Sequence, residues 1–371
     1  MSIKAKYNSL NESQKSIVKM LGILLSIILI FLIIILIIAI INGGKKSNEQ
    51  IELIMERAAE KYVNANPTVI KDEIYGNTEI DVNTLAEGKY MKPFTKYYGK
   101  ETLCTGKVIV YKNLDYYDYI PKIDCGENYQ TKSLSSVIVD DSNITTKEAG
   151  LYRIDNRYVY RGEYVDNYVS FENQLWRIID INENGEIKIF QDQSEYETVW
   201  DDRFNSDYQE YVGINSFENV EPSRIKATIL DAYNNMSNEV KSKVIPKEYC
   251  IGKRNESDAS KDGSSECNVK TELMGASGII VSDYLMASLD PKCNNTLSTE
   301  CENYNYMANL GRSTWTVTAD SDNTKRAYAI SNGLTKKAVT GELNLRLVIT
   351  INGNINYSGG TGTVSDPYII R

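Results

Sequence analysis

Residues 168–190, YVSFENQLWRIIDINENGEIKIF, set the fold class of the larger part of the chain. Short runs of β-branched and aromatic residues are separated here by turn-forming residues, a pattern typical of β-strands. Asn184-Gly185 lies between two such runs, and this dipeptide favours a hairpin because both residues accept the positive φ that a tight turn requires. The stretch therefore predicts an antiparallel sheet built from strand–turn–strand units.

The same pattern of short strand-forming runs and turn residues extends on both sides of this stretch, from residue 150 to the end of the chain. Residues 345–351, LRLVITI, and a glycine-rich bend before residues 368–370 predict further strands. Two helices interrupt them, at 222–236, where Pro222 stands at the start, and after Ser282, which can cap the helix. We expect an α+β domain over residues 150–371, with antiparallel hairpins and two or more helices.

Residues 104–125, CTGKVIVYKNLDYYDYIPKIDC, predict a second hairpin nearer the N-terminus. The midpoint between its two cysteines falls between Leu114 and Asp115. A two-residue turn there would make Cys104 and Cys125 direct neighbours across the strands, with Cα atoms ~5.5 Å apart, within the disulfide range. The alternative is a pair of unlinked thiols at the strand ends.

A helix and a linker complete the predicted organisation around this hairpin. Apolar residues recur at helical spacing in 49–63, EQIELIMERAAEKYV, and a small helix is expected near Val82 to Glu87. These helices and the hairpin would form a compact module over residues 43–133. Residues 134–149 are expected to be a linker, whose centre at Val137–Val139 could add a strand.

The most apolar part of the chain runs from Met20 to Ile41, MLGILLSIILIFLIIILIIAII, and has no charge. As a helix it would reach ~33 Å, enough to cross a hydrocarbon core of ~30 Å. A cleaved signal peptide and a buried core helix are the alternatives; a signal peptide would end in small residues, whereas Ile40 and Ile41 follow Ala39. We expect a cytoplasmic tail at 1–19 and a single transmembrane helix at 20–42 that places the chain in the cell membrane.

Cysteine placement decides the expected orientation. Lysines flank the apolar segment on both sides, so the positive-inside rule favours a cytoplasmic N-terminus only weakly. All cysteines follow this segment, and an even number in one compartment indicates disulfides formed outside the cell. Proximity in the sequence pairs the last four as neighbours, whereas the rival metal site would need a C-x-x-C motif that the sequence lacks. The six cysteines are Cys104, Cys125, Cys250, Cys267, Cys293 and Cys301.

Composition excludes several kinds of chemistry. The chain has no histidine, which removes Ser/His/Asp and Cys/His catalysis and His-ligated zinc. A formal net charge of −9 disfavours nucleic-acid binding. Asp320 and Asp322 are calcium candidates, as is the pair Asp201-Asp202, although solvated loop acids are the simpler interpretation. No catalytic residue and no cofactor are predicted.

Three motifs carry a resemblance: W-R-I-I at 176–179, S-D-Y-L-M-A-S-L at 282–289, and G-T-V-S-D-P-Y-I-I at 362–370. Residues 150–371 resemble a surface domain of low-GC Gram-positive bacteria, similar in architecture to the C-type-lectin-like fold of formylglycine-generating enzymes. In this family a proline usually follows the arginine of the penultimate strand, whereas in this chain Leu347 follows Arg346. Residues 49–131 resemble a pilin-like stalk module, but the chain lacks the prepilin processing site, which favours an anchored protein over a pilin subunit.

The resemblance implies a membrane-anchored extracellular protein without assigned activity, either a binding and adhesion module or a structural component of the envelope. The expected partners are the lipid bilayer through residues 20–42 and a glycan, a cell-wall polymer or another surface protein; the 27 tyrosines suit such surfaces. The alternative is a cell-envelope glycan hydrolase using two carboxylates. An aromatic shelf between residues 195 and 345 would favour binding, and a deep acidic cleft would favour catalysis.

Overall fold

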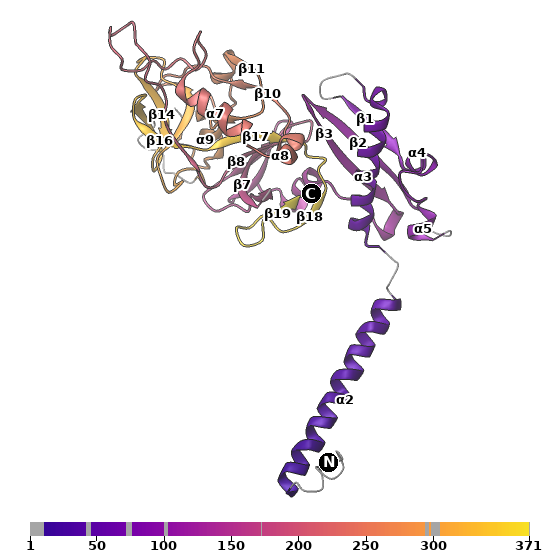
Figure 1. Ribbon diagram of the computed structural model, residues 1–371. Coiled ribbons are helices and arrows are strands. Elements are labelled where there is room, and N and C mark those ends of the chain that lie inside the picture. Colours follow the sequence, from indigo (N-terminus) through magenta and orange to yellow (C-terminus); the bar gives the residue numbers. More distant parts are fainter. Residues whose placement is uncertain are drawn as a thin grey trace.

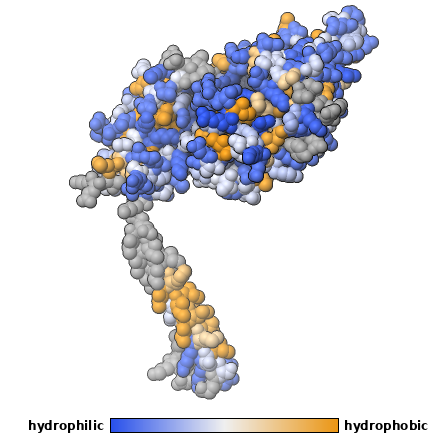
Figure 2. Space-filling view, turned by 180° about the vertical axis from the view of Figure 1, so that it is seen from behind, coloured by the Kyte–Doolittle hydropathy of each residue, from blue (hydrophilic) through white to orange (hydrophobic). Residues whose placement is uncertain are grey.

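A long N-terminal helix precedes a mixed α+β body made mostly of sheets (Figure 1). The computed structural model describes residues 11–41, 46–71, 76–99, 103–171, 173–293, 297 and 305–370. Helix α2 (Glu12–Ile41) begins before the predicted Met20, because Asn11 and Gln14 exchange side-chain and backbone hydrogen bonds of 2.9 and 3.2 Å that cap it. Within the described ranges it is the one helix long and apolar enough to span a membrane, and Figure 2 shows its hydrophobic surface.

The first part of the body is a three-stranded antiparallel sheet with helix α3 (Asn48–Ala65) packed on it (Figure 1). Ser47 and Gln50 form a capping box that fixes where α3 begins. The helix buries one apolar face, which includes Ile51, Met55 and Ala59. The other elements are η1 (Pro67–Val69), β1 (Asn77–Asp81), α4 (Val82–Glu87), α5 (Thr95–Tyr98), β2 (Thr105–Asn113), β3 (Tyr116–Asp124) and η2 (Gly126–Asn128).

Strands β2 and β3 form the predicted hairpin. Their register pairs Thr105 with Asp124 and Asn113 with Tyr116, which leaves Leu114 and Asp115 as the turn. Leu114 has φ +51°, as a two-residue turn of this kind requires. Cys104 and Cys125 are disulfide-bonded, which confirms the predicted pair, and their Cα atoms are 4.2 Å apart, closer than the expected separation.

The segment expected to be a linker is instead packed against the sheet that follows it. Residues Leu134–Ile138 form helix α6, capped by Ser133, so the strand predicted at Val137–Val139 was wrong. Leu134 and Ile138 are one turn apart and both fully buried, which favours a helix over a strand. The Leu134 amide also donates to the carbonyl of Ile355, 2.8 Å away. A short turn, η3 (Asp141–Asn143), follows.

The rest of the chain builds two larger sheets and a small one. The nine-stranded sheet has the order β12-β17-β8-β7-β6-β19-β18, with β4 and β5 attached beside β7, and the five-stranded sheet has the order β15-β14-β13-β16-β9. Most pairings are antiparallel, as predicted, but β19 runs parallel to β6 and β16 runs parallel to β13. The five-stranded sheet lies on the side away from α3 (Figure 1).

These elements have the following bounds. The strands are β4 (Gly150–Ile154), β5 (Arg157–Arg161), β6 (Tyr168–Phe171), β7 (Gln174–Ile181), β8 (Ile187–Gln191), β9 (Tyr196–Val199), β10 (Lys247–Cys250), β11 (Lys270–Met274), β12 (Ser277–Gly278), β13 (Thr314–Ala319), β14 (Arg326–Ile330), β15 (Leu334–Ala338), β16 (Glu342–Leu345), β17 (Leu347–Ile351), β18 (Tyr357–Gly359) and β19 (Tyr368–Ile370). The helices are α7 (Arg224–Asn234), α8 (Asn238–Lys243), η4 (Glu266–Asn268) and α9 (Val281–Ala287).

Both predicted helices are present, with different caps. Helix α7 begins after Ser223, whose hydroxyl accepts from the Lys226 amide, so Pro222 lies outside the helix. Helix α9 begins before Ser282, and Asp283 rather than Ser282 accepts from the Ile280 amide at its N-terminus, 3.2 Å away. The Ser282 hydroxyl is directed instead at a buried carboxylate.

That carboxylate belongs to Glu266, which forms a fully buried ion pair with Arg254. One guanidinium nitrogen of Arg254 lies 3.1 Å from Glu266 Oε2, and both side chains have no exposed surface. Glu266 also accepts from the amide and the hydroxyl of Ser282, at 3.0 and 2.6 Å. The ion pair therefore fixes the N-terminus of α9 against the polar loop between β10 and β11.

A disulfide closes this loop. Cys250 and Cys267 are bonded, which confirms the pairing by proximity. Cys293 is also disulfide-bonded, while its predicted partner Cys301 lies outside the described residues. The loop's order thus comes from a covalent bond and a buried ion pair, since its sequence has few apolar residues to bury.

We predict that Arg254→Met lowers the free energy of unfolding by about 3–5 kcal/mol, because it leaves Glu266 as a buried unpaired charge. The double variant Arg254→Met, Glu266→Leu should lose less than the sum of the two single variants. Urea unfolding of all three variants measures both effects. A single-variant loss below about 1 kcal/mol would show that the pair is not a structural constraint.

Candidate functional site

The loop after β9, residues 201–213, presents a cluster of exposed aromatic rings. Phe204, Tyr208 and Tyr211 are 44%, 40% and 79% exposed. The rings of Phe204 and Tyr211 meet edge to face with centroids 5.3 Å apart. The ammonium of Lys325 lies 3.6 Å from the centre of the Tyr208 ring. The rings and this ammonium form a mixed aromatic and polar surface, called here the aromatic loop surface.

Buried amide groups hold this loop in place. The Asn205 side chain is fully buried and donates to the Gly213 carbonyl, 2.7 Å away, and to the Thr324 hydroxyl. Thr324 in turn donates to Asp207 across 2.8 Å. Because each of these contacts fixes a point next to an aromatic residue, the rings project from a preorganised backbone rather than from a free loop.

The base of the loop is fixed by a second buried ion pair. Arg203 Nε lies 2.7 Å from Asp201 Oδ2, and Asp201 is completely buried. Gly213 has φ +75°, and a Cβ there would lie 2.4 Å from the Asp201 carbonyl oxygen. Only glycine therefore allows the chain to return this close to its starting point.

The β13–β14 turn is hydrogen-bonded to Asn215, which follows the aromatic loop in the chain. The Asn215 side-chain amide donates to the carbonyls of Asp320, Asn323 and Arg326 at 2.6–2.9 Å. Lys253 donates to the oxygen of the same side chain across 2.8 Å. The turn and the aromatic loop surface therefore form one unit.

The calcium candidates lie in this region. Asp322 is exposed and its carboxylate accepts from the Ser321 hydroxyl, whereas the other candidates have cationic partners. Asp320 is buried, and its Oδ1 accepts from the Lys336 ammonium at 3.0 Å and from the Asp322 amide at 3.0 Å. A calcium ion would compete with Lys336 for this oxygen. Asp201 and Asp202 pair with arginines. Among the described residues, no group of three or more acidic or cysteine side chains could hold a metal ion.

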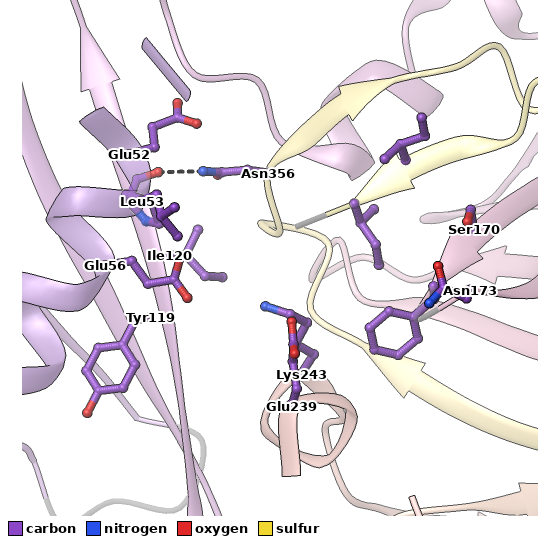
Figure 3. Close-up of a pocket in the computed structure, with 14 residues that line it drawn as sticks. Glu52, Leu53, Glu56, Tyr119, Ile120, Ser170, Asn173, Glu239, Lys243 and Asn356 are labelled. Carbon is purple, nitrogen blue, oxygen red and sulfur yellow. Dashed lines mark hydrogen bonds between the residues drawn. The ribbon is translucent and has the colours of Figure 1, made fainter. Parts of the chain in front are cut away.

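A cavity with a volume of about 420 Å³ lies where the α3 module meets the rest of the body (Figure 3). Glu56 points toward it from one side, and Glu239 and Lys243 lie on the other (Figure 3). Its lining is part acidic and part apolar. The lining residues are Glu52, Leu53, Glu56, Tyr119, Ile120, Pro121, Ser170, Phe171, Asn173, Glu239, Lys243, Asn356, Ile369 and Ile370.

Polar contacts around this cavity join the two parts of the chain. Lys243 lies 3.4 Å from Asp118, and both are buried. Asn356 donates to the Pro121 carbonyl across 2.9 Å, the bond drawn in Figure 3. Lys122 donates to the Asn354 carbonyl and the Asn356 side chain at 2.8 and 2.9 Å. Strand β3 is at the edge of its sheet, and these contacts cover that edge, which protects it from pairing with other strands.

Burial dominates the pKa values of three groups at this junction, whereas the neighbouring acids outweigh it at Lys243, whose pKa is raised. Burial raises the pKa of Glu56 and the pKa of Asp118, in both cases against the lowering effect of Lys243. It also lowers the pKa of Lys122 to about 8, despite the nearby Glu52 and Asp118. The junction therefore favours the neutral form of each of these three groups more than water does.

Comparison with known proteins gives no match: no family model, no curated protein and no solved structure is similar to this chain. The geometry of the chain itself is therefore the basis for any functional conclusion. The region between residues 195 and 345 carries the aromatic loop surface, while the 420 Å³ cavity is formed largely by residues outside that region.

Sequence reasoning named Asp201-Asp202 at the start of this loop, but neither its aromatic residues nor the cavity. Phe204, Tyr208 and Tyr211 stand at i, i+4 and i+7, the spacing of one helix face, whereas the structure forms turns here, so local spacing gave no signal for an exposed ring cluster. The cavity joins segments from residue 52 to residue 370, and no local pattern connects these. Arg346, which was noted because leucine rather than proline follows it, is buried and donates to the carbonyl of Gln191.

We predict that the lowered pKa of Lys122 makes stability rise with pH. Between pH 8 and about 10.5 the unfolded chain holds a proton that the folded chain has lost, so raising the pH favours the folded state. The free energy of unfolding of the wild type minus that of Lys122→Met should increase across this window. Lys92→Met, at an exposed position, is the matched control and should give a flat difference. The prediction would be contradicted if the difference between wild type and Lys122→Met were as flat with pH as the difference between wild type and Lys92→Met.

Proposed function

We propose that this chain is a membrane-anchored surface protein whose C-terminal domain binds a glycan or cell-wall polymer of the envelope through the aromatic loop surface. The observation that carries the proposal is the trio of exposed rings Phe204, Tyr208 and Tyr211 on a backbone fixed by buried hydrogen bonds. On this proposal the domain has a C-type-lectin-like fold, and the α3 module is a pilin-like stalk.

The anchor rests on the apolar helix α2 and on the oxidised cysteines. Side chains such as Ile23 and Leu25 are more than 60% exposed, and burying this surface in lipid removes it from water. Disulfides persist outside the reducing cytosol, and the two bonded pairs support a body outside the cell and an N-terminus inside it.

The chemistry of the loop suits carbohydrate. An aromatic face gives a sugar ring a flat apolar contact at small entropic cost, because the ring has few rotatable bonds. Asp207, Glu210 and Lys325 border the rings and supply hydrogen-bonding groups for hydroxyls. An exposed ring cluster fixed in place fits a ligand that is long and open better than a small molecule that needs enclosure.

We expect the full-length protein to fractionate with membranes. Protease treatment of intact cells should remove the body, and its sulfurs should resist alkylation until reduced. Replacing Ile28 and Leu29 by lysine should release the chain from the membrane, because a charge at the centre of a transmembrane helix costs about 2.5–3.5 kcal/mol. The exchange Ile28→Leu, Leu29→Ile is the control. A protease-protected body with freely alkylatable sulfurs would refute the proposed topology.

We expect the full-length protein in lipid nanodiscs to bind isolated envelope glycans and selected members of a glycan array. The triple variant Phe204→Ala, Tyr208→Ala, Tyr211→Ala should lose binding at least tenfold, since each ring contact contributes about 0.5–1.5 kcal/mol. Tyr164→Ala removes a ring that is 82% exposed elsewhere and should bind like the wild type. Profiles that are flat for the wild type, or unchanged in the triple variant, would remove the basis of the proposal.

A further inference from the structure

A polar row crosses one face of the nine-stranded sheet, which is otherwise rich in isoleucine and valine. Asp180 on β7 lies opposite Lys188 on β8, and Lys188 lies opposite Thr350 on β17. Ser277 on β12 lies opposite Val348, two residues along β17 from Thr350. Paired residues on neighbouring strands share a face of the sheet, so these four side chains belong to the same side.

A pocket of about 240 Å³ opens over this row. Strand β10 forms its other side with Lys247 and Tyr249, and Asn182 and Glu186 close one end. The volume is below the ~300–1,000 Å³ typical of sites for drug-sized ligands. The pocket therefore suits a ligand of the size of a single sugar or amino acid.

Two polar groups in this pocket lack partners. The Ser277 hydroxyl is buried, with the residue 1% exposed, and has no hydrogen-bond partner in the part of the chain described. The carboxylate of Asp180 makes no hydrogen bond or ion pair with any described residue, and burial raises its pKa. A buried polar group without a partner is uncommon because it costs about 1–3 kcal/mol, so the Ser277 hydroxyl is a point where a ligand can bind. The carboxylate of Asp180, which is half-buried in the same pocket, is a second such point.

The lysines of the pocket are already neutralised by other acids. Lys188 lies 2.6 Å from Asp283, the residue that caps α9. Lys247 lies 2.7 Å from Glu186, whose other contact is the Asn182 side chain. Asp180 and Glu248 are the acids of this lining without an ion pair among the described residues, and Glu248 is exposed. The partner that Asp180 lacks inside the pocket is a cation, with a hydrogen-bonding group near it for Ser277.

We infer that this pocket is a binding site for a small primary amine that carries hydroxyl groups, such as an amino sugar, with its ammonium at Asp180 and a hydroxyl at Ser277. A primary ammonium supplies the charge and the donors that Asp180 lacks, and a hydroxyl can both donate to and accept from Ser277. The site lies on a different sheet from the aromatic loop surface and does not depend on it.

The test is calorimetric titration of full-length protein in lipid nanodiscs with D-glucosamine, and with D-glucose as the isosteric neutral probe. Saturable binding of glucosamine that exceeds glucose binding at least tenfold is expected. Asp180→Asn should weaken it at least tenfold and Ser277→Ala about threefold, while Asp202→Asn, at an exposed acid, should leave it unchanged. Thermal unfolding confirms that each variant folds.

Equal binding of the amine and the neutral sugar would overturn the inference, as would amine binding that neither Asp180→Asn nor Ser277→Ala changes. The pocket would then hold water only. If Asp180→Asn fails to fold, the Ser277→Ala result and the preference for glucosamine over glucose decide the question. The triple aromatic variant should bind glucosamine like the wild type, so that the two sites succeed or fail separately.

Discussion

The buried ion pair between Arg254 and Glu266 is the interaction on which the outer part of the C-terminal domain depends. Beyond its contact with Glu266, Arg254 uses its backbone to bind the chain at Ala319 and Ser321, which begins the β13–β14 turn. That turn holds Asn215 and Thr324, and Thr324 holds Asn205 in the aromatic loop. A charge pair taken out of water is costly unless every hydrogen bond is made, so this network tolerates few alternative arrangements.

The sequence predicted those parts of the fold that local physics decides. The hairpin at 104–125 follows from the spacing of two cysteines around a turn, and α3 follows from apolar residues at helical spacing. The coarse α+β class follows from alternating strands and a few amphipathic segments. In each case the residues that determine the element are close together in the chain.

Parts decided by distant residues were missed or wrong. Ser282 has the composition of a cap, but Glu266 competes successfully for its hydroxyl and Asp283 takes the capping role. Residues 134–138 have enough β-branched character for a strand, yet docking on the segment near Ile355 favours a helix. The candidate sites also depend on distant residues: the Asp180 pocket is lined by residues of five strands, β7, β8, β10, β12 and β17, and nothing local marks Ser277 as unpartnered.

The two proposed sites suit ligands of different form. The aromatic loop surface is exposed and fixed in place, which favours one segment of an extended polymer, whereas the pocket over β7, β8 and β17 is a small recess that fits a single small unit. They lie on separate sheets of one domain. A surface protein of this design would contact an envelope polymer and one of its small building units independently.

The Cys104–Cys125 bond also determines how the protein would respond to mechanical tension. A protein fixed in a membrane at α2 and pulled at a ligand on its outer loops transmits the force along its backbone through the α3 module. The disulfide joins two points separated by 21 positions in the sequence, so the force passes across the sulfurs and bypasses strands β2 and β3. The hairpin that forms the junction with the C-terminal domain would keep its register under stretching, and extension would have to begin elsewhere.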